Sequence, residues 1–87
     1  MKNFTLEITT PAGVRFSGDA VQLSVRAIDG ELAVMADHIP LVTALNDGEC
    51  RIYLPDGEMR RATVGGGLLF VSKEKTKLLS STFEFVQ

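Results

Sequence analysis

The chain has one cysteine and one histidine among its 87 residues, and it has no tryptophan. The lone Cys50 excludes an intramolecular disulfide, and with one histidine no set of three or four Cys and His metal ligands can be assembled. We therefore expect no metal site and no cofactor. Cys50 shares its parity with Ile52 and alternates with Arg51, which indicates that its thiol is buried.

The sequence also lacks a large excess of charge of one sign and any long apolar run. The formal net charge is -2, so there is no broad positive field to neutralise a phosphate backbone, and no nucleic-acid partner is expected. No apolar run approaches the roughly 20 residues that a membrane-spanning helix needs, and a charge interrupts residues 1–7, where a secretory signal would lie. With 45% hydrophobic and 23% charged residues, the composition is typical of one soluble cytosolic domain over residues 1–87.

What the sequence does contain is an alternation of apolar and polar residues with a period of two. It is clearest where Val21, Leu23 and Val25 alternate with polar residues, and it recurs over residues 4–9. Every second side chain of a strand lies on the same face, so one face of each strand is expected to be core. Further strands are expected at residues 14–16, 50–54, 59–64, 68–71 and 77–80, with turns at 11–13, 55–58 and 72–76. The pattern predicts an all-β fold, an antiparallel sandwich or flattened barrel.

The residues that acid–base or nucleophilic catalysis needs do not form a recognisable pattern. His38 follows Asp37 directly, and Ser17 or Thr43 would have to complete a triad. Neighbours in a strand point to opposite faces, and the chain has no Gly-x-Ser-x-Gly elbow. We therefore expect no catalytic residues.

Three consecutive glycines, Gly65, Gly66 and Gly67, raise the question of a phosphate-binding loop. Such loops need a helix N-terminus directly behind the glycines, whereas residues 68–71 have the composition of a strand. The interpretation we favour is a bulge, or a place where another backbone or a partner comes close.

Residues 29–41 differ from the rest of the chain because they interrupt the strand alternation. The segment begins with a glycine turn, carries acidic residues beside Leu32, Val34 and Met35, and ends at Pro40. A long ordered connection with apolar side chains is commonly a binding loop. This segment is therefore expected to bind partner proteins and to indicate which ones they are.

The same segment resembles a known family. Residues 29–45 read DGELAVMADHIPLVTAL and are followed by Gly48 and Ile52. This is similar to the signature of the epsilon subunit of bacterial and chloroplast F-type ATP synthases, although Ala33 and Ala36 replace the usual Gly and Pro. Residues 4–18 are similar to the first hairpin of that family, and residues 64–68 to its Gly-Gly turn.

The resemblance implies a fold of about ten short strands at the foot of the central stalk, bound to the gamma subunit and resting on the c-ring. It implies a non-catalytic rotor subunit that supports coupling and assembly while proton flow turns the ring. The expected location is peripheral, at the cytoplasmic face of a bacterial inner membrane, with the membrane reached only through the c-ring.

The resemblance also implies site residues. The expected loop facing the c-ring is the set Asp29, Glu31, Leu32 and His38, with His38 at the same end of the sandwich as Glu31. The expected surface facing the gamma subunit is the set Thr10, Pro11, Thr43, Gly66 and Gly67. Acidic groups opposite basic ring loops would supply orientation and register more than affinity.

Two further expectations concern ligands. Typical family members continue into a C-terminal helical hairpin that can inhibit ATP hydrolysis and in some members binds ATP. The present sequence stops after Phe85, Val86 and Gln87, so neither helical inhibition nor nucleotide binding is expected of it. The alternative is a sandwich that binds a sugar or nucleotide between its sheets, for which a chain with one tyrosine, Tyr53, and few convergent polar groups is poorly furnished.

Overall fold

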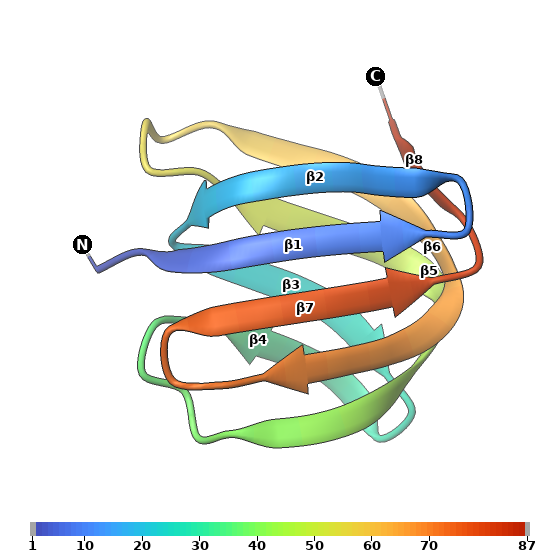
Figure 1. Ribbon diagram of the computed structural model, residues 1–87, viewed down its shortest axis with the longest axis horizontal. Coiled ribbons are helices and arrows are strands. Elements are labelled where there is room, and N and C mark those ends of the chain that lie inside the picture. The colour runs from blue at the N-terminus through green and yellow to red at the C-terminus, as the bar shows by residue number, and fades with distance from the viewer. Residues whose placement is uncertain (1, 87) are drawn as a thin grey trace.

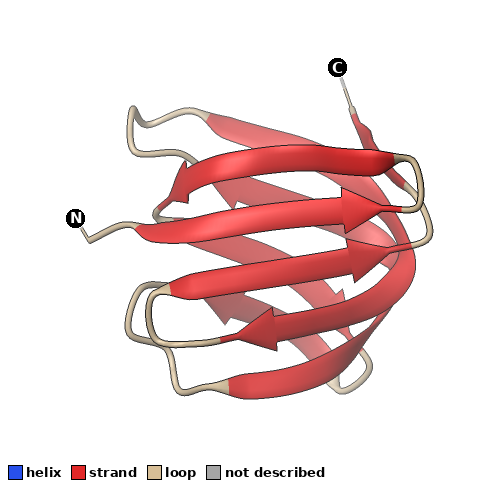
Figure 2. Ribbon diagram, viewed as in Figure 1, coloured by secondary structure: helices blue, strands red, loops and turns tan. Residues whose placement is uncertain are grey.

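The computed structural model describes residues 2–86, so Met1 and Gln87 of the expected domain lie outside the described residues. Its strands are β1 (Phe4–Thr10), β2 (Gly13–Ala20), β3 (Gln22–Ala27), β4 (Gly30–Val34), β5 (Leu41–Tyr53), β6 (Met59–Val71), β7 (Lys75–Ser80) and β8 (Phe83–Phe85). Figures 1 and 2 show strands and loops throughout, which confirms the all-β prediction. Among residues 2–86 there is accordingly no helix with the length and apolarity needed to cross a membrane.

The strands form two layers that share the two longest strands. Neighbours follow the order β2-β1-β7-β6-β5-β3-β4, and β8 pairs with β6 off this path. Strands β5 and β6 pair from Leu41 opposite Val71 to Tyr53 opposite Met59, and both bend, so that each contributes to both layers (Figure 1). We call β2, β1 and β7, with the second part of β6 and the first part of β5, the front layer. The back layer contains β8, the first part of β6, the second part of β5, β3 and β4.

The strand number and direction differ from the expectation of about ten antiparallel strands. The described residues form eight strands, because β5 and β6 each run for 13 residues through the bend instead of being divided by it. Their pairs are antiparallel except for β1 and β7, which run parallel from Thr5 opposite Lys75 to Thr9 opposite Leu79. This parallel pair arises because β7 returns to the front layer beside β1 after the hairpin with β6.

The core lies between the layers and follows the predicted alternation. Leu6, Ile8 and Leu23 are fully buried, and so is Cys50, as predicted from its parity with Ile52. Burial of one leucine or isoleucine side chain stabilises the fold by roughly 1.5–3 kcal/mol. Desolvation raises the pKa of the Cys50 thiol to about 12. The thiol is therefore a small apolar core group rather than a nucleophile.

The glycines at residues 65–67 mark the point where β6 changes partners, from β8 before them to β7 after them. A Cβ on Gly67, where φ is +142°, would lie 1.8 Å from the carbonyl oxygen of Leu79. A Cβ on Gly65 would lie 2.2 Å from Oγ1 of Thr82, and the Gly65 N–H donates to the Thr82 carbonyl at 3.0 Å. The predicted close approach of another backbone is confirmed, and the strand continues through the glycines without a helix behind them.

Candidate protein-docking surface

The segment over residues 29–41 is not one loop, which corrects the sequence-based expectation. Ile28 and Asp29 form the turn of a hairpin, and Gly30–Val34 is strand β4, paired with β3 from Ala27 opposite Gly30 to Leu23 opposite Val34. Only residues 35–40 form a loop. Alternation is weak in β4 because the strand has five residues and the first two are exposed. So short an alternating pattern cannot be distinguished from a loop in the sequence.

The expected c-ring residues are divided between the two ends of β4. Glu31 lies opposite Arg26 near the β3–β4 turn, whereas His38 follows the far end of the strand. Figure 1 shows the β3–β4 turn and the loop of residues 35–40 at opposite ends of the sandwich. The prediction that His38 shares an end with Glu31 is therefore wrong, because a strand separates residues that the sequence places close together.

The residues at the turn end have different environments. Asp29 and Glu31 are exposed, and Glu31 lies on the outer face of the back layer. Leu32 is half-buried and packs against the core, so its side chain is directed between the layers. Ala33, one of the two departures from the family pattern, is an exposed strand residue opposite Ser24. The turn end thus presents carboxylates to solvent, while Leu32 anchors the strand.

The loop of residues 35–40 is held at the other end by the N-terminal segment and the β6–β7 turn. Asp37 has a φ of +65°, and its N–H donates to the carbonyl of Lys73 at 3.1 Å. Its carboxylate accepts a hydrogen bond from Lys2, which lowers the pKa of Asp37 and raises the pKa of Lys2. His38 Nδ1 lies 2.8 Å from the carbonyl oxygen of Ile39, so the imidazole contacts its own loop.

The expected gamma-facing residues lie on neighbouring strands of the front layer, but their side chains do not all face the same side of the sheet. Thr10 is buried and closes the β1–β2 turn, because its Oγ1 accepts from the Ala12 N–H at 3.2 Å and donates to the Gly13 carbonyl at 3.5 Å. Pro11 is exposed at this turn. Thr43 has the inward parity of Leu45, so it faces away from the outer surface of the front layer.

The two glycines of that set lie at the bend of β6. Gly67 is exposed and opposite Ser80, while Gly66 is half-buried, with a φ of +75°. A Cβ on Gly66 would lie 3.2 Å from Oδ1 of Asp47. Of the expected set, Thr10, Pro11 and Gly67 line the same groove, although Thr10 is largely buried.

Exposed apolar side chains form a row that crosses the outer face of the front layer and ends at the β3–β4 turn, with the half-buried Thr9 and Ala44 between them. Leu79 lies opposite Leu68 on one side and Thr9 on the other, and Thr9 lies opposite Val14. On the far side, Leu68 lies opposite Ala44, whose carbonyl accepts from the N–H of Ile28 at 3.1 Å. The exposed fractions are 59% for Val14, 40% for Leu79, 43% for Leu68 and 57% for Ile28. We call Val14, Thr9, Leu79, Leu68, Ala44 and Ile28 the apolar row.

Sequence reasoning did not identify the apolar row, although a signal for it is present. Leu68 precedes Leu69, and Leu79 follows Leu78, so each doublet has one leucine on the inner and one on the outer face. An apolar doublet inside an alternating strand therefore indicates an apolar outer position. Its alignment with other doublets depends on the pairing register.

A groove of about 440 Å³ lies in the middle of the row. It is lined by Thr9, Thr10, Pro11, Gly67, Leu68, Leu79, Ser80 and Ser81. Beside the row, Glu7 lies 3.9 Å from Nζ of Lys75 and 3.8 Å from Nζ of Lys77. We call these three residues the charged belt. Two ammonium groups share one carboxylate there, so the belt carries an excess positive charge.

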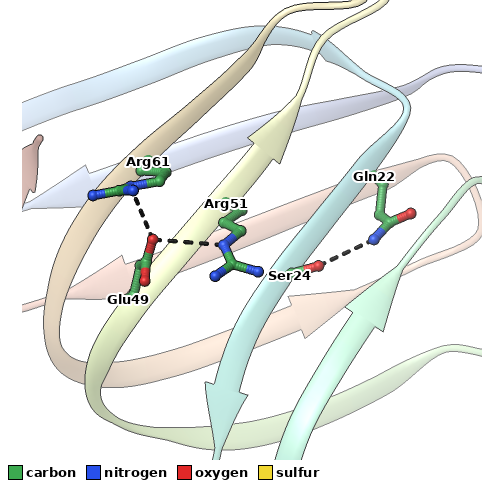
Figure 3. A network of polar contacts seen from close by, with 5 residues as sticks. All are labelled: Gln22, Ser24, Glu49, Arg51 and Arg61. Carbon is green, nitrogen blue, oxygen red and sulfur yellow. Dashed lines mark hydrogen bonds and ion pairs between the residues drawn. The ribbon is translucent and has the colours of Figure 1, made fainter. Parts of the chain in front are cut away.

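The outer face of the back layer is polar instead. Glu49 lies between Arg61, at 3.0 Å, and Arg51, at 3.5 Å. On the neighbouring strand β3, Gln22 donates a hydrogen bond to Ser24 (Figure 3). Glu49 raises the pKa of Arg51 mainly through its charge. Such exposed ion pairs contribute little to stability because solvent screens them. Two guanidinium groups share one carboxylate here, so this cluster also carries an excess positive charge, and its exposed charged groups are typical of a solvated surface.

Tyr53, the residue behind the small-ligand alternative, belongs to the same outer face. Cys50 and Ile52 are buried between the layers, so Tyr53, with the opposite parity, points outward beside Gln22. It does not furnish a site between the sheets. No group of three or more His, Cys, Asp or Glu side chains within residues 2–86 has the arrangement of a metal site.

A small β-sandwich with one polar outer face and one apolar row is the architecture of a domain that docks onto other proteins, because contiguous exposed apolar surface marks interaction sites. Comparison with known proteins identifies the family. Residues 3–86 match the model of the β-sandwich domain of the delta/epsilon chain of ATP synthase. The chain belongs to this family.

Its relatives are epsilon chains of bacterial ATP synthases. The ATP synthase epsilon chain of Caldicellulosiruptor bescii is 39% identical over 85 residues, which cover 98% of this chain and 61% of the relative. The sodium-ion-specific epsilon chain of Propionigenium modestum is 42% identical over 80 residues, covering 92% and 58%. The chain therefore spans about three fifths of the length of these relatives.

Solved structures show the same fold. A chain of the mitochondrial ATP synthase of Euglena gracilis, in an assembly of OSCP, F1 and c-ring, superimposes with a TM-score of 0.91 at 18% identity over 95% of this chain and 53% of that chain. A chain of the central stalk and c-ring of the Tetrahymena thermophila mitochondrial enzyme gives 0.77 at 12% identity, over 94% and 66%.

Proposed function

We propose that this chain is a non-catalytic rotor subunit of a proton-translocating F-type ATP synthase, and that it connects the gamma subunit to the c-ring. The observation that carries the proposal is the apolar row, because a member of this family must meet its partners through its outer surface. The proposed location is the cytoplasmic face of a bacterial inner membrane, with membrane contact only through the ring. No nucleotide is expected to bind this sandwich.

The gamma subunit is assigned to the outer face of the front layer. Pro11 and Gly67 line the groove of the apolar row, and Thr10 shapes the adjacent turn from within. Thr43 supports this face from its inner side, opposite the buried Leu69. A complex in which a partner covers this apolar surface is stabilised by roughly 25 cal/mol per Å² of apolar surface removed from water.

The c-ring is assigned to the turn between β3 and β4. Asp29 and Glu31 are exposed there, and Ile28 of the same turn is the last member of the apolar row. A partner on the row and a partner on the turn would therefore be neighbours. The turn is held by the pairing of β3 with β4 on one side and with β5 on the other. A torque applied to the carboxylates of Asp29 and Glu31 would therefore be passed into the sandwich.

The first experiment tests association with the gamma subunit. The purified chain and the gamma subunit of the same complex are mixed and run on gel filtration at several salt concentrations. Co-elution as one complex is expected. Separate elution at all salt concentrations would contradict the proposal.

A second experiment tests the c-ring assignment in a complex of this chain with gamma and the ring. Glu31→Lys reverses one exposed charge at the β3–β4 turn and is expected to weaken ring binding by roughly 2- to 5-fold, the range of an exposed ion pair. Glu58→Lys makes the same change in the β5–β6 turn at the other end and is the control. Equal effects of the two changes would show that the wrong end was assigned.

A further inference from the structure

The polar atoms around the groove in the apolar row are already engaged within the chain. Oγ of Ser81 donates to the Gly65 carbonyl at 2.6 Å, and Oγ of Ser80 donates to the Thr82 carbonyl at 2.6 Å. Oγ1 of Thr10 is used in the β1–β2 turn. Although hydroxyl residues are among the lining residues, few hydrogen-bonding groups remain for a ligand. The groove is therefore suited to an apolar occupant and not to a sugar or nucleotide.

The shape of the groove follows from the bend of β6. Gly67 has no side chain, and the β7 backbone passes so close that any side chain there would meet the Leu79 carbonyl. Gly67 therefore contributes only backbone to the groove, beside the paired Leu68 and Leu79, and Pro11 borders it from the β1–β2 turn. The volume of about 440 Å³ is near the lower end of the roughly 300–1,000 Å³ of ligand sites. This volume is large enough for a large side chain, and the engaged hydroxyl groups favour an apolar one.

The position of the groove is central in the apolar row. Neighbouring strands lie about 4.8 Å apart, so the row from Val14 to Ile28 extends roughly 24 Å across the sheet. The groove lies between β1, β7 and β6, near the middle of that length. Residues that dominate binding energy cluster at the centre of an interface in desolvated pockets.

The charged belt adds a requirement on the occupant. Lys77 lies on the same outer face as Leu79, two residues before it, which is about 7 Å along a strand. Lys75 and Lys77 both approach Glu7 at nearly 4 Å, so one carboxylate is shared by two ammonium groups. A partner carboxylate at this distance from the groove would meet an ammonium group that is not fully neutralised.

Resting on the proposed function, we propose that the groove between Pro11, Leu68 and Leu79 receives one large apolar side chain of the gamma subunit, and that an acidic residue of gamma beside this anchor meets Lys77. The anchor supplies affinity because its side chain leaves water, and the charge pair sets its orientation. The occupant is thus an apolar residue accompanied by a carboxylate.

The test is calorimetric titration of the full chain with the gamma subunit. Leu79→Ser removes one wall of the groove, while the inner Leu78 is kept, and it is expected to raise Kd by about 10-fold or more, the effect of a hot-spot residue. Val42→Ser is the matched control, because Val42 is 66% exposed on the same outer face but lies outside the row. Its Kd is expected to stay within about 3-fold of the unmodified chain.

The charge pair is tested by two changes with opposite expected signs. Lys77→Glu should raise Kd because it places like charges together, and the effect should shrink as salt is raised. Glu7→Gln should lower Kd by about 2- to 5-fold at low salt, since both lysines then become available to the partner. A rise in Kd for Glu7→Gln would overturn the assignment of the carboxylate.

Methyl NMR of the unmodified chain provides a readout that does not depend on a variant's folding. Titration with gamma is expected to shift the methyl signals of Leu68 and Leu79 and to leave those of Val42 unchanged. If gamma binds but these leucine signals do not move, or if Leu79→Ser and Val42→Ser weaken binding equally, the groove is not the anchor site, while the proposed function stands. If gamma does not bind the unmodified chain, the proposed function fails. A dimer of the free chain that Leu79→Ser dissociates would assign the groove to a second copy and overturn the proposal.

Discussion

At the scale of single residues, Gly67 combines a backbone conformation and a neighbourhood that only glycine satisfies. Its φ of +142° lies in a region that side chains disfavour, and the Leu79 carbonyl occupies the place of a Cβ at 1.8 Å. Gly57 has a comparable φ of +94° in the β5–β6 turn, but nothing lies within 4 Å of its would-be Cβ. The pair separates the cost of backbone conformation from the cost of a clash.

We predict that Gly67→Ala destabilises the chain far more than Gly57→Ala. The second change should cost about 1–2 kcal/mol, the cost of the backbone conformation alone. The first adds a collision with backbone that no flexible side chain can relieve, so a loss above about 4 kcal/mol or failure to fold is expected. Urea denaturation followed by circular dichroism measures both, and equal midpoints would contradict the close approach.

Because Cys50 is buried, we predict that the free energy of unfolding depends on pH in the alkaline range. Burial raises the pKa of its thiol from 9.0 to about 12, so between these values the unfolded chain releases a proton that the folded chain retains. The unfolded state then binds fewer protons, and the free energy of unfolding falls by up to about 1.4 kcal/mol per pH unit. Cys50→Ala should remove this contribution. Urea titrations of both chains at pH 8, 9 and 10 check it, and parallel pH profiles would contradict it.

At the scale of elements, the strands differ in how many partners they have. β6 is paired with β5 on one side and with β8 and then β7 on the other. Within residues 2–86, β4 pairs only with β3 and β8 only with β6. Backbone opening is least costly where a strand has one ladder and few buried side chains. The edge strands are therefore the places where this sandwich should open first.

We predict that amides of β4 and β8 exchange with solvent before those of β6. The difference in protection is expected to exceed about 10-fold, since opening β6 breaks two ladders and exposes core residues such as Leu69. Hydrogen exchange followed by mass spectrometry or NMR measures this. Uniform protection across the strands would show that the chain opens only globally.

At the scale of the whole molecule, the two layers share β5 and β6, so we expect them to form together. The core from Leu6 in the front layer to Leu23 in the back layer is continuous. We therefore propose that residues 1–87 act as one domain. The apolar row and the polar back face then belong to one rigid body, as the proposed transmission of torque between two partners would require.

One cooperative transition is the expected consequence. Thermal or urea unfolding followed by the fluorescence of Tyr53, in the back layer, and by circular dichroism, which reports all strands, should give coincident curves. The tyrosine signal is usable because the chain has no tryptophan. Two separated transitions would show that the layers unfold independently and would contradict the single domain.

Much of the fold was predictable from local pattern, and much of the site was not. Alternation at Phe4, Leu6 and Ile8 identified buried positions, because in a strand the period of two directly sets which side faces the core. The position of His38 relative to Glu31 was predicted wrongly, since a five-residue strand was not recognised within residues 29–41. Thr10 and Thr43 were placed on the gamma-facing surface, although Thr10 continues the inward series of Leu6 and Ile8, and Thr43 shares the inward parity of Leu45.

The sequence by itself determined the all-β class, the buried thiol of Cys50 and the family, and it limited Gly65, Gly66 and Gly67 to a bulge or a close approach. These depend on the local period of side chains, on the steric freedom of glycine and on motif order, all of which are present in the linear chain. Only the tertiary structure decided that Val14, Ile28, Leu68 and Leu79 form one row with a groove at its centre. Such a row arises from the pairing register of strands that are distant in sequence, and a slip of one residue would turn each of these side chains to the other face.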